Sequence, residues 1–101
     1  MTTTKLPKLS GTESLILELL RPQEMYGLQL VTESKGTLKR GSVYVTLGRM
    51  EEKGYVESRA EEKPDHAGLP RRLYRATGLG MRVQDAWSIM VASLASVRRH
   101  A

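Results

Sequence analysis

Apolar residues recur at helical spacing in the middle of the chain. Val43, Leu47 and Met50 stand at i, i+4 and i+7, which places them in one stripe along a helix of about three turns. Gly54 ends this helix, and an extended segment begins directly at Tyr55. A short helix that leads straight into a strand is typical of a winged helix-turn-helix.

Two further helices are expected before this central one. Ser10 and Glu13 have the S-x-x-E spacing of a capping box, which starts a first helix that runs to about Arg21. A second helix is expected over 26–35, and Gly36 supplies the left-handed residue at its end. The side chains expected to face the core from these two helices are Leu15, Ile16, Leu19, Leu20, Leu28, Leu30 and Val31.

A pair of strands and a long last helix complete the pattern. Short strands are expected over 55–59 and 71–76. The segment between them, 60–70, is polar and too long for a tight hairpin, which indicates a wing. Thr77 then caps a last helix that runs to about Arg98.

The last helix carries apolar residues spaced four, three, four and three apart, which is the a/d seam of a heptad. The seam positions are Val83, Trp87, Met90, Leu94 and Val97. A chain of 101 residues has little other core to cover such a seam, so we expect a homodimer; a helix packed on its own domain is the alternative. The expected architecture is mainly α with a small β-hairpin. A polar arm (1–9) precedes a winged helix-turn-helix domain (10–80), and a C-terminal dimerisation helix (81–101) follows.

The charge of the chain narrows the choice of partner. The formal net charge is +5, and basic residues exceed acidic ones between Lys35 and Arg75, which favours nucleic acid or a membrane surface. The last helix is too sparsely basic on its polar face for a membrane role, and no apolar run is long enough to span a bilayer. The N-terminus lacks the apolar core of a signal peptide, and the absence of cysteine fits a reducing cytosol. A soluble, cytoplasmic protein is expected.

The face of the central helix that the core does not use carries groups suited to a DNA groove. Ser42 and Thr46 are short donors that allow close approach to base edges, and Arg49 can reach a guanine or a phosphate. Val45 can meet a thymine methyl group, and neighbouring cations can pair with phosphates. The candidate DNA-binding residues are Ser42, Val45, Thr46, Arg49 and Lys53 on the helix, Lys39 and Arg40 before it, and Arg71 and Arg72 at the wing. The alternative is that they form only the solvated face of a surface helix.

Catalysis finds no support in the sequence. His66 and His100 stand without a plausible nucleophile or carboxylate constellation, so no enzyme, metal site or cofactor is expected. The main rival to a DNA-binding protein is a winged helix that serves as a protein-interaction module and does not read DNA. Acidic residues near the expected DNA face give this rival some support; they are Glu51, Glu52, Glu61 and Glu62.

Three separated motifs occur in a definite order along the chain. They are Met25-Tyr26-Gly27, the run from Gly41 to Val56, and the segment from Arg71 to Thr77. In order and spacing these motifs resemble the PadR family of transcriptional regulators. The resemblance implies a winged-helix homodimer that represses transcription, with a C-terminal helix that makes the dimer. It also implies that Tyr26, Ser42 and Tyr44 help contact the DNA backbone, although helical geometry alone puts Tyr44 off the groove-facing side.

A dimer of this kind is expected to bind double-stranded DNA at a palindromic operator, with its two recognition helices in major grooves about 34 Å apart. In some proteins similar to this chain, aromatic residues on the final helix line a cavity at the dimer interface and stack planar compounds. Trp87 and Met90 offer polarisable surface for a small planar hydrophobic effector in this way. An ordinary anchor of the dimer seam is the simpler interpretation of Trp87.

Two glycines at the start of the last helix depart from the family pattern. Gly78 and Gly80 are expected to weaken that helix end by about 1 kcal/mol each relative to alanine. Gly48 costs the central helix a similar amount unless something packs closely against it. These departures leave the expected fold unchanged.

Overall fold

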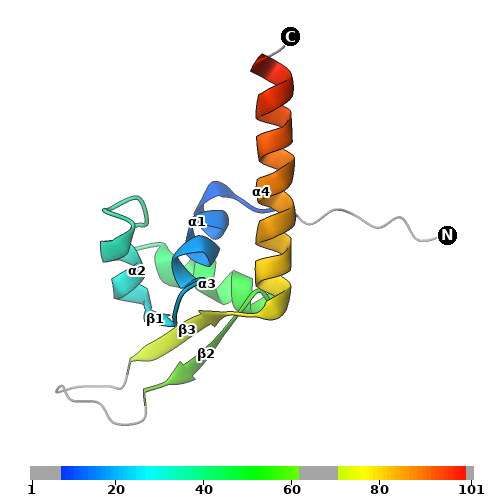
Figure 1. The fold of residues 1–101 in the computed structure, drawn as a ribbon. Coiled ribbons are helices and arrows are strands. Elements are labelled where there is room, and N and C mark those ends of the chain that lie inside the picture. Colours follow the sequence, from blue (N-terminus) through cyan, green and yellow to red (C-terminus); the bar gives the residue numbers. More distant parts are fainter. Residues whose placement is uncertain (1–7, 62–70, 100–101) are drawn as a thin grey trace.

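The computed structural model describes residues 8–61 and 71–99, which form four helices and a three-stranded sheet (Figure 1). In chain order the elements are α1 (Gly11–Leu20), β1 (Met25–Tyr26), α2 (Gly27–Glu33), α3 (Val43–Glu52), β2 (Val56–Ala60), β3 (Arg72–Ala76) and α4 (Gly78–Arg99). The mainly α fold with a small β-hairpin is therefore confirmed. Most of the expected arm and wing, together with Glu62, His66 and His100, lies outside the described residues.

The sheet is antiparallel, and β3 is its central strand, with β1 on one side and β2 on the other. Val56 pairs with Ala76 at one end of the hairpin, and Ala60 pairs with Arg72 at the other. The two-residue strand β1 was not predicted, because Tyr26 was expected at the start of the second helix. Tyr26 instead pairs with Leu73, and α2 begins one residue later.

The core lies between the three short helices and the sheet. The stripe predicted on α3 is confirmed, because Val43, Leu47 and Met50 are all buried. The prediction for α2 was wrong at Leu28, which is 39% exposed in the first turn of this short helix, whereas Leu30 is fully buried. The full set of buried apolar side chains is Leu9, Ile16, Leu17, Leu20, Met25, Leu30, Leu38, Val43, Leu47, Met50, Tyr55, Val56, Tyr74 and Val83.

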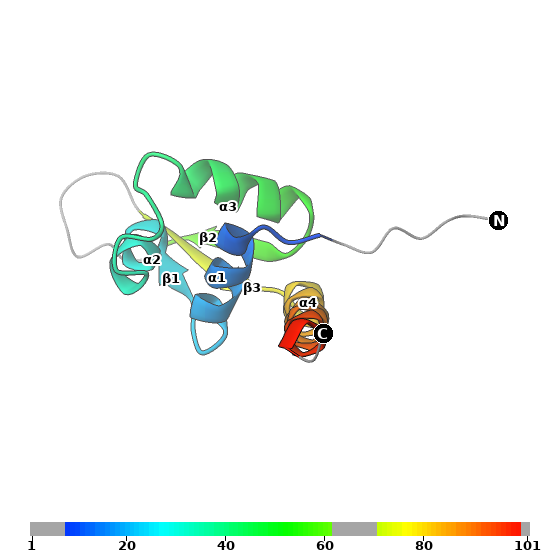
Figure 2. The ribbon, with the colours of Figure 1, turned by 90° about the horizontal axis from the view of Figure 1, so that it is seen from above.

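α1 is the central helix of the packing, with α3 on one side of it and α4 on the other (Figure 2). Leu17, which was not assigned to the core, is fully buried for this reason, because α1 buries more than one face. The predicted capping box is present: the Glu13 backbone N–H donates to Ser10 Oγ at 3.1 Å, and the Ser10 N–H donates to Glu13 Oε1 at 2.9 Å. Gly36 and Gly54 have positive φ angles of 84° and 81°, as expected at helix ends.

The first half of α4 is joined to α1 by a buried amide. Gln84 is 2% exposed; its Oε1 accepts from Ser14 Oγ at 2.8 Å, and its Nε2 donates to Glu18 Oε2 at 3.0 Å. The second half of α4 extends beyond the rest of the chain (Figure 1), and the side chains of residues 91–96 are exposed. The helix is thus anchored at one end only.

The start of α4 corrects the expectation for Gly80. A Cβ atom at this position would overlap the carbonyl oxygen of Tyr55 and lie 2.9 Å from its carbonyl carbon. The Gly80 N–H donates to Thr77 Oγ1 at 3.0 Å, and the Thr77 hydroxyl donates to the Gly54 carbonyl at 2.6 Å. Gly80 therefore allows α4 to begin directly against the chain that enters β2, and it does not merely weaken the helix.

Candidate nucleic-acid interface

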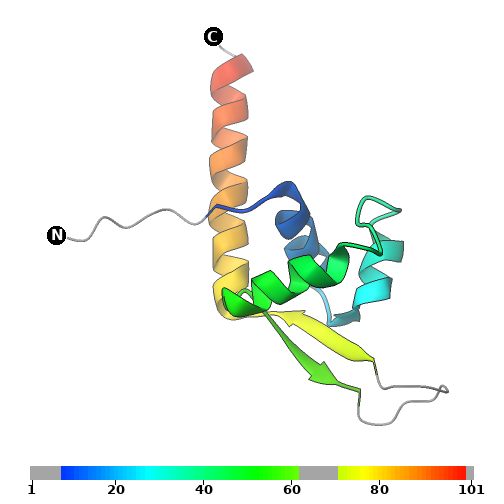
Figure 3. The same cartoon turned by 180° about the vertical axis from the view of Figure 1, so that it is seen from behind.

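α3 lies across one side of the molecule, above the β2–β3 hairpin (Figure 3). The burial of its apolar stripe leaves the opposite face to solvent, where Ser42, Val45 and Arg49 are exposed. Thr46 is half-buried, and its hydroxyl donates to the Ser42 carbonyl at 3.2 Å. The structure thus brings the predicted groove-facing residues onto one accessible face, with Thr46 partly engaged by its own helix.

The cations before α3 are held by the turn that starts the helix. The Lys39 carbonyl accepts from the backbone N–H groups of Ser42 and Val43, at 3.1 and 2.9 Å. Lys39 and Arg40 are both exposed in this turn, immediately ahead of the exposed face of α3. Their position is suited to contacts with phosphates that flank a groove.

Lys53, predicted to bind DNA, has a partner inside the protein. Its Nζ donates to Glu13 Oε2 at 2.8 Å, and it lies 5.9 Å from the centre of the Tyr55 ring. Burial opposes ionisation of Glu13, but the hydrogen bonds from Lys53 and Ser10 outweigh it and lower the pKa of this carboxyl. Lys53 therefore ties the end of α3 to the start of α1.

Four side chains from distant parts of the sequence meet at one notch: Tyr26, Tyr44, Arg71 and Arg72. They line a hollow of about 120 Å³ together with Gly27, Leu28 and Gln29. The ring of Tyr44 packs on Gly27 so closely that a Cβ atom there would lie 2.5 Å from Tyr44 Cε1. The guanidinium of Arg71 lies over the ring of Tyr26, 4.1 Å from its centre. We call these four residues, Tyr26, Tyr44, Arg71 and Arg72, the wing-root notch.

Acidic residues border this notch. Arg72 Nε donates to Ser58 Oγ at 3.1 Å, and Ser58 Oγ donates to Glu51 Oε2 at 2.8 Å. Burial, and then the charge of Glu51, raise the pKa of the nearby Tyr74. Glu61 contacts both Tyr26 and Arg71. The contacts of Glu61 were missed at the sequence level; the only signal was an acidic residue at the end of a strand in a basic region.

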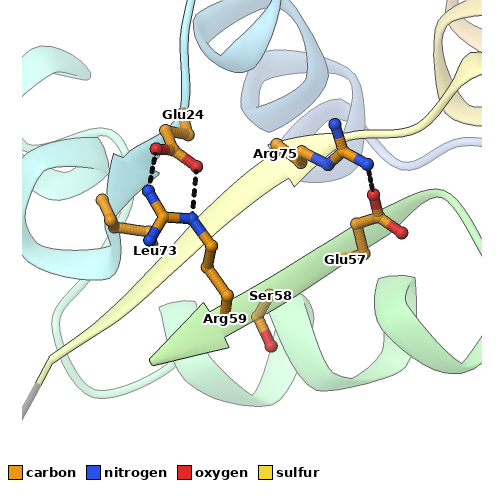
Figure 4. A pocket seen from close by; sticks show the side chains of 6 residues that line it. All are labelled: Glu24, Glu57, Ser58, Arg59, Leu73 and Arg75. Carbon is orange, nitrogen blue, oxygen red and sulfur yellow. Dashed lines mark hydrogen bonds and ion pairs between the residues drawn. The ribbon is translucent and has the colours of Figure 1, made fainter. Parts of the chain in front are cut away.

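A second charged cluster lies on the outer face of the sheet (Figure 4). Arg59 forms an ion pair with Glu24 from the segment before β1, and Arg75 forms one with Glu57. The hydrogen bonds from Arg59 lower the pKa of Glu24. These pairs line a hollow of about 350 Å³ with Ser58 and Leu73. Because each guanidinium faces a carboxylate, the cluster offers no excess of positive charge and we leave it outside the candidate interface.

The predicted dimer seam divides into two parts. Val83 is 7% exposed and belongs to the core of its own chain, so it is already covered. Trp87 and Met90 are half-buried, and Leu94 is 58% exposed; the side chain of Val97 lies outside the described part of the chain. Ile89, which was not predicted, is 68% exposed on another side of α4. A groove of about 350 Å³ runs between α1 and α4 and is lined by Gly11, Ser14, Trp87, Ser88, Val91, Ala92 and Ala95.

Among the described residues, no group of three or more His, Asp or Glu side chains is placed to hold a metal ion. Within the same part of the chain, no helix combines the length and apolar character needed to cross a membrane. The features that remain are an exposed polar helix face, a notch lined by tyrosine and arginine, and an apolar helix end.

Comparison with known proteins places this arrangement in a family. The model of the transcriptional regulator PadR-like family matches residues 16–86. The fold is similar to that of a PadR family transcription regulator from Clostridium difficile R20291, with a TM-score of 0.78 and 22% identity over 90% of this chain and 97% of that one. No curated protein sequence matches the chain significantly.

Two further solved structures share the fold. A PadR-like transcription factor from Bacteroides fragilis has a TM-score of 0.75 and 22% identity, over 87% of this chain and 86% of that one. Bacillus subtilis PadR, solved in complex with operator DNA, has a TM-score of 0.72 and 21% identity; the match covers 82% of this chain and 49% of that one. At these identities the likeness establishes the fold.

Proposed function

The chain belongs to the PadR-like family of transcriptional regulators, and on this premise we propose that it is a homodimeric repressor that binds double-stranded operator DNA in the cytoplasm. The observation that carries the proposal is the position of the exposed face of α3 next to the wing-root notch. One surface then offers both groups that can read bases and groups that can hold phosphates.

α3 is the proposed recognition helix. Its exposed Ser42, Val45 and Arg49 would enter the major groove, where hydroxyl, methyl and guanidinium groups distinguish base pairs. Lys39, Arg40 and the wing-root notch would hold the phosphates on either side. The Bacillus subtilis PadR structure, which contains operator DNA, supports this use of the fold.

The exposed end of α4 is the proposed dimer contact. Val91 and Leu94 are large apolar side chains that are exposed to solvent in the single chain, and they follow the half-buried Trp87 on the same side of α4. A two-fold dimer through α4 would present two copies of α3 to a palindromic operator, with half-sites about 34 Å apart.

The groove between α1 and α4 is the proposed site for a small planar hydrophobic effector. Trp87 lines this groove and is the only tryptophan of the chain, so its fluorescence reports directly on what binds there. Saturable quenching by a planar aromatic compound, together with a loss of operator affinity, would support release by an effector. Quenching without any change in operator affinity would mean that the compound binds but does not release DNA, and no quenching would limit Trp87 to a packing role.

The test of DNA binding is a fluorescence-anisotropy titration with a labelled duplex from the region upstream of the gene, at two salt concentrations. A scrambled duplex of equal length is the control. We expect preferential binding to the upstream duplex and a steep loss of affinity at the higher salt concentration, because bound phosphates release counterions. Weak binding to both duplexes at low salt would overturn the proposal and favour the protein-interaction module.

A further inference from the structure

Glu61 closes the hairpin at the wing root. Its backbone N–H donates to the Arg71 carbonyl at 2.9 Å, which extends the ladder one step beyond the pair of Ala60 and Arg72. The position of its backbone is therefore fixed by the hairpin. Its side chain is only 9% exposed, although the residue carries a carboxylate at the edge of a basic surface.

The carboxylate of Glu61 accepts from donors of the wing-root notch. The Tyr26 hydroxyl donates to Oε1 at 2.9 Å, and the Arg71 backbone N–H donates to Oε2 at 3.2 Å. The Arg71 guanidinium reaches Oε1 at 3.4 Å while it lies over the Tyr26 ring. A phenol, a backbone amide and a guanidinium thus converge on one oxyanion.

The same three kinds of donor bind phosphate oxygens in protein–DNA complexes. A carboxylate and a phosphate present similar acceptor oxygens, so one can take the place of the other. The hollow beside Arg71 has a volume of about 120 Å³, well above the ~10–15 Å³ that admits one water molecule. A phosphate group can therefore approach Arg71 and Tyr26 from the side of the hollow.

We propose that Glu61 is an internal competitor for a DNA phosphate at the wing-root notch. This inference rests on the proposed DNA binding and adds a regulator of its strength. In the free protein the Glu61 carboxylate neutralises Arg71 and engages Tyr26. When DNA binds, a backbone phosphate displaces the carboxylate, which rotates away while the hairpin ladder stays intact.

The competition weakens binding to every DNA sequence by the same factor, because phosphate contacts carry no base information. On non-specific DNA the base contacts of α3 contribute little, so this loss of affinity leaves the protein mostly unbound there. The operator then remains occupied because α3 supplies contacts that a random duplex cannot give.

The test compares two substitutions that remove the same charge from opposite ends of one hairpin. Glu61→Gln keeps one acceptor oxygen, for either Tyr26 or the Arg71 amide, but loses the charge that neutralises the guanidinium. Glu57→Gln is the matched control, because Glu57 pairs with Arg75 on the outer face of the sheet. Anisotropy titrations use the intact protein with the upstream duplex and with the scrambled duplex, and thermal unfolding checks that both variants are folded.

We expect Glu61→Gln to bind both duplexes about three- to tenfold more tightly than the wild type, with an unchanged ratio between them, and Glu57→Gln to differ by less than about twofold. In an Arg71→Ala background the gain from Glu61→Gln should disappear, because the competition acts through this guanidinium. Weaker binding of Glu61→Gln would overturn the inference, since Glu61 would then orient Tyr26 and Arg71 for DNA. An equal gain in both single variants would also overturn it, because the effect would come from net charge. If the wild type and Glu61→Gln both ignore DNA, the proposed function fails and the inference fails with it.

Discussion

α3 and the second half of α4, which extends beyond the rest of the chain, each have a face that the core does not cover. The two faces have opposite chemistry. On α3 the exposed side chains include Ser42 and Arg49, and the wing-root notch lies beside them. On α4 they include Val91 and Leu94, which are 48% and 58% exposed. A polar, cationic face suits a polyanion, whereas an apolar face suits another apolar surface.

The difference predicts opposite responses to salt. Binding through phosphate contacts releases the counterions that are condensed on DNA. This release becomes less favourable as the salt concentration rises, so the affinity falls steeply. Association through apolar side chains is insensitive to moderate salt, because its driving force is the removal of apolar area from water. The two functions proposed for this chain can therefore be separated by substitutions in one helix and by salt.

The largest effect is expected from a charge placed on the apolar end of α4. Leu94→Asp should raise the dissociation constant of the dimer by at least about 100-fold, because each of two protomers loses about 1.5–3 kcal/mol of side-chain burial and must accommodate a carboxylate. Sedimentation velocity over a range of protein concentrations measures this shift. Ser93→Asp, at the adjacent exposed position, is the control for added charge.

Sedimentation velocity at high salt tests the predicted difference in salt response between dimerisation and DNA binding. The wild-type dimer constant should change little, while operator affinity falls. A Leu94→Asp protein that remains fully dimeric at micromolar concentration would place the dimer contact elsewhere.

The next largest effect is expected at Gly80, where the start of α4 packs against Tyr55, between α3 and β2. Gly80→Ala should lower the free energy of unfolding by about 3 kcal/mol, because its Cβ would overlap the Tyr55 carbonyl and the clash is with backbone. Gly48→Ala on α3 is the matched substitution and should raise stability by about 0.5–1 kcal/mol, since nothing lies within 4 Å of a Cβ there. Urea unfolding followed by circular dichroism separates them, and equal losses in both variants would contradict the close approach at Gly80.

These glycines illustrate how far the sequence predicted the fold. Local period and caps predicted α3 with its buried stripe, the capping box of α1 and the positive φ angles of Gly36 and Gly54, because each of these depends on neighbours within a few residues; α2 ends at Glu33, two residues before the expected Lys35. Gly80 was misjudged because its constraint comes from Tyr55, on another part of the chain. β1 and the burial of Leu17 were missed for the same reason.

In the candidate site too, features set by neighbouring residues were predicted and contacts between distant residues were not. Helical geometry predicted that Ser42, Val45 and Arg49 share an exposed face. The closeness of Tyr26 to Arg71 and Glu61 could not be predicted, because Tyr26 and Glu61 are 35 residues apart and meet only when β1 pairs with β3. The ion pair of Lys53 with Glu13 joins residues 40 positions apart, so it could not be predicted from the sequence either.

A smaller effect is expected on α3. Arg49→Ala should cost about 1–3 kcal/mol of operator affinity if the guanidinium reads a base, and the scrambled duplex should lose much less. Equal losses on both duplexes would make Arg49 a phosphate contact. Arg82→Ala, which removes an exposed arginine from α4, is the control in the same anisotropy titration. Unchanged affinity of Arg49→Ala for the operator would remove this residue from the interface.

The smallest effect concerns Lys53, which ends α3 but pairs with α1. Lys53→Met keeps the side-chain stem and should lower the free energy of unfolding at pH 7 by about 0.2–1 kcal/mol, a modest value because the lysine is 46% exposed. The pKa of Glu13 is lowered in the folded protein, so the stability it contributes is present above its ordinary pKa of 4.5 and is lost as the pH falls through the folded value. The difference between wild type and Lys53→Met should therefore vanish in acid, once Glu13 is protonated.

Urea unfolding at a series of pH values measures this, and Lys39→Met, at another exposed lysine, controls for the loss of a positive charge. Operator affinity provides the second readout. Because Lys53 is already engaged with Glu13, its substitution should weaken DNA binding less than Arg49→Ala does. A larger loss of affinity with unchanged stability would mean that Lys53 leaves Glu13 for a phosphate, and α3 would then bind DNA along its whole length rather than through its first two turns.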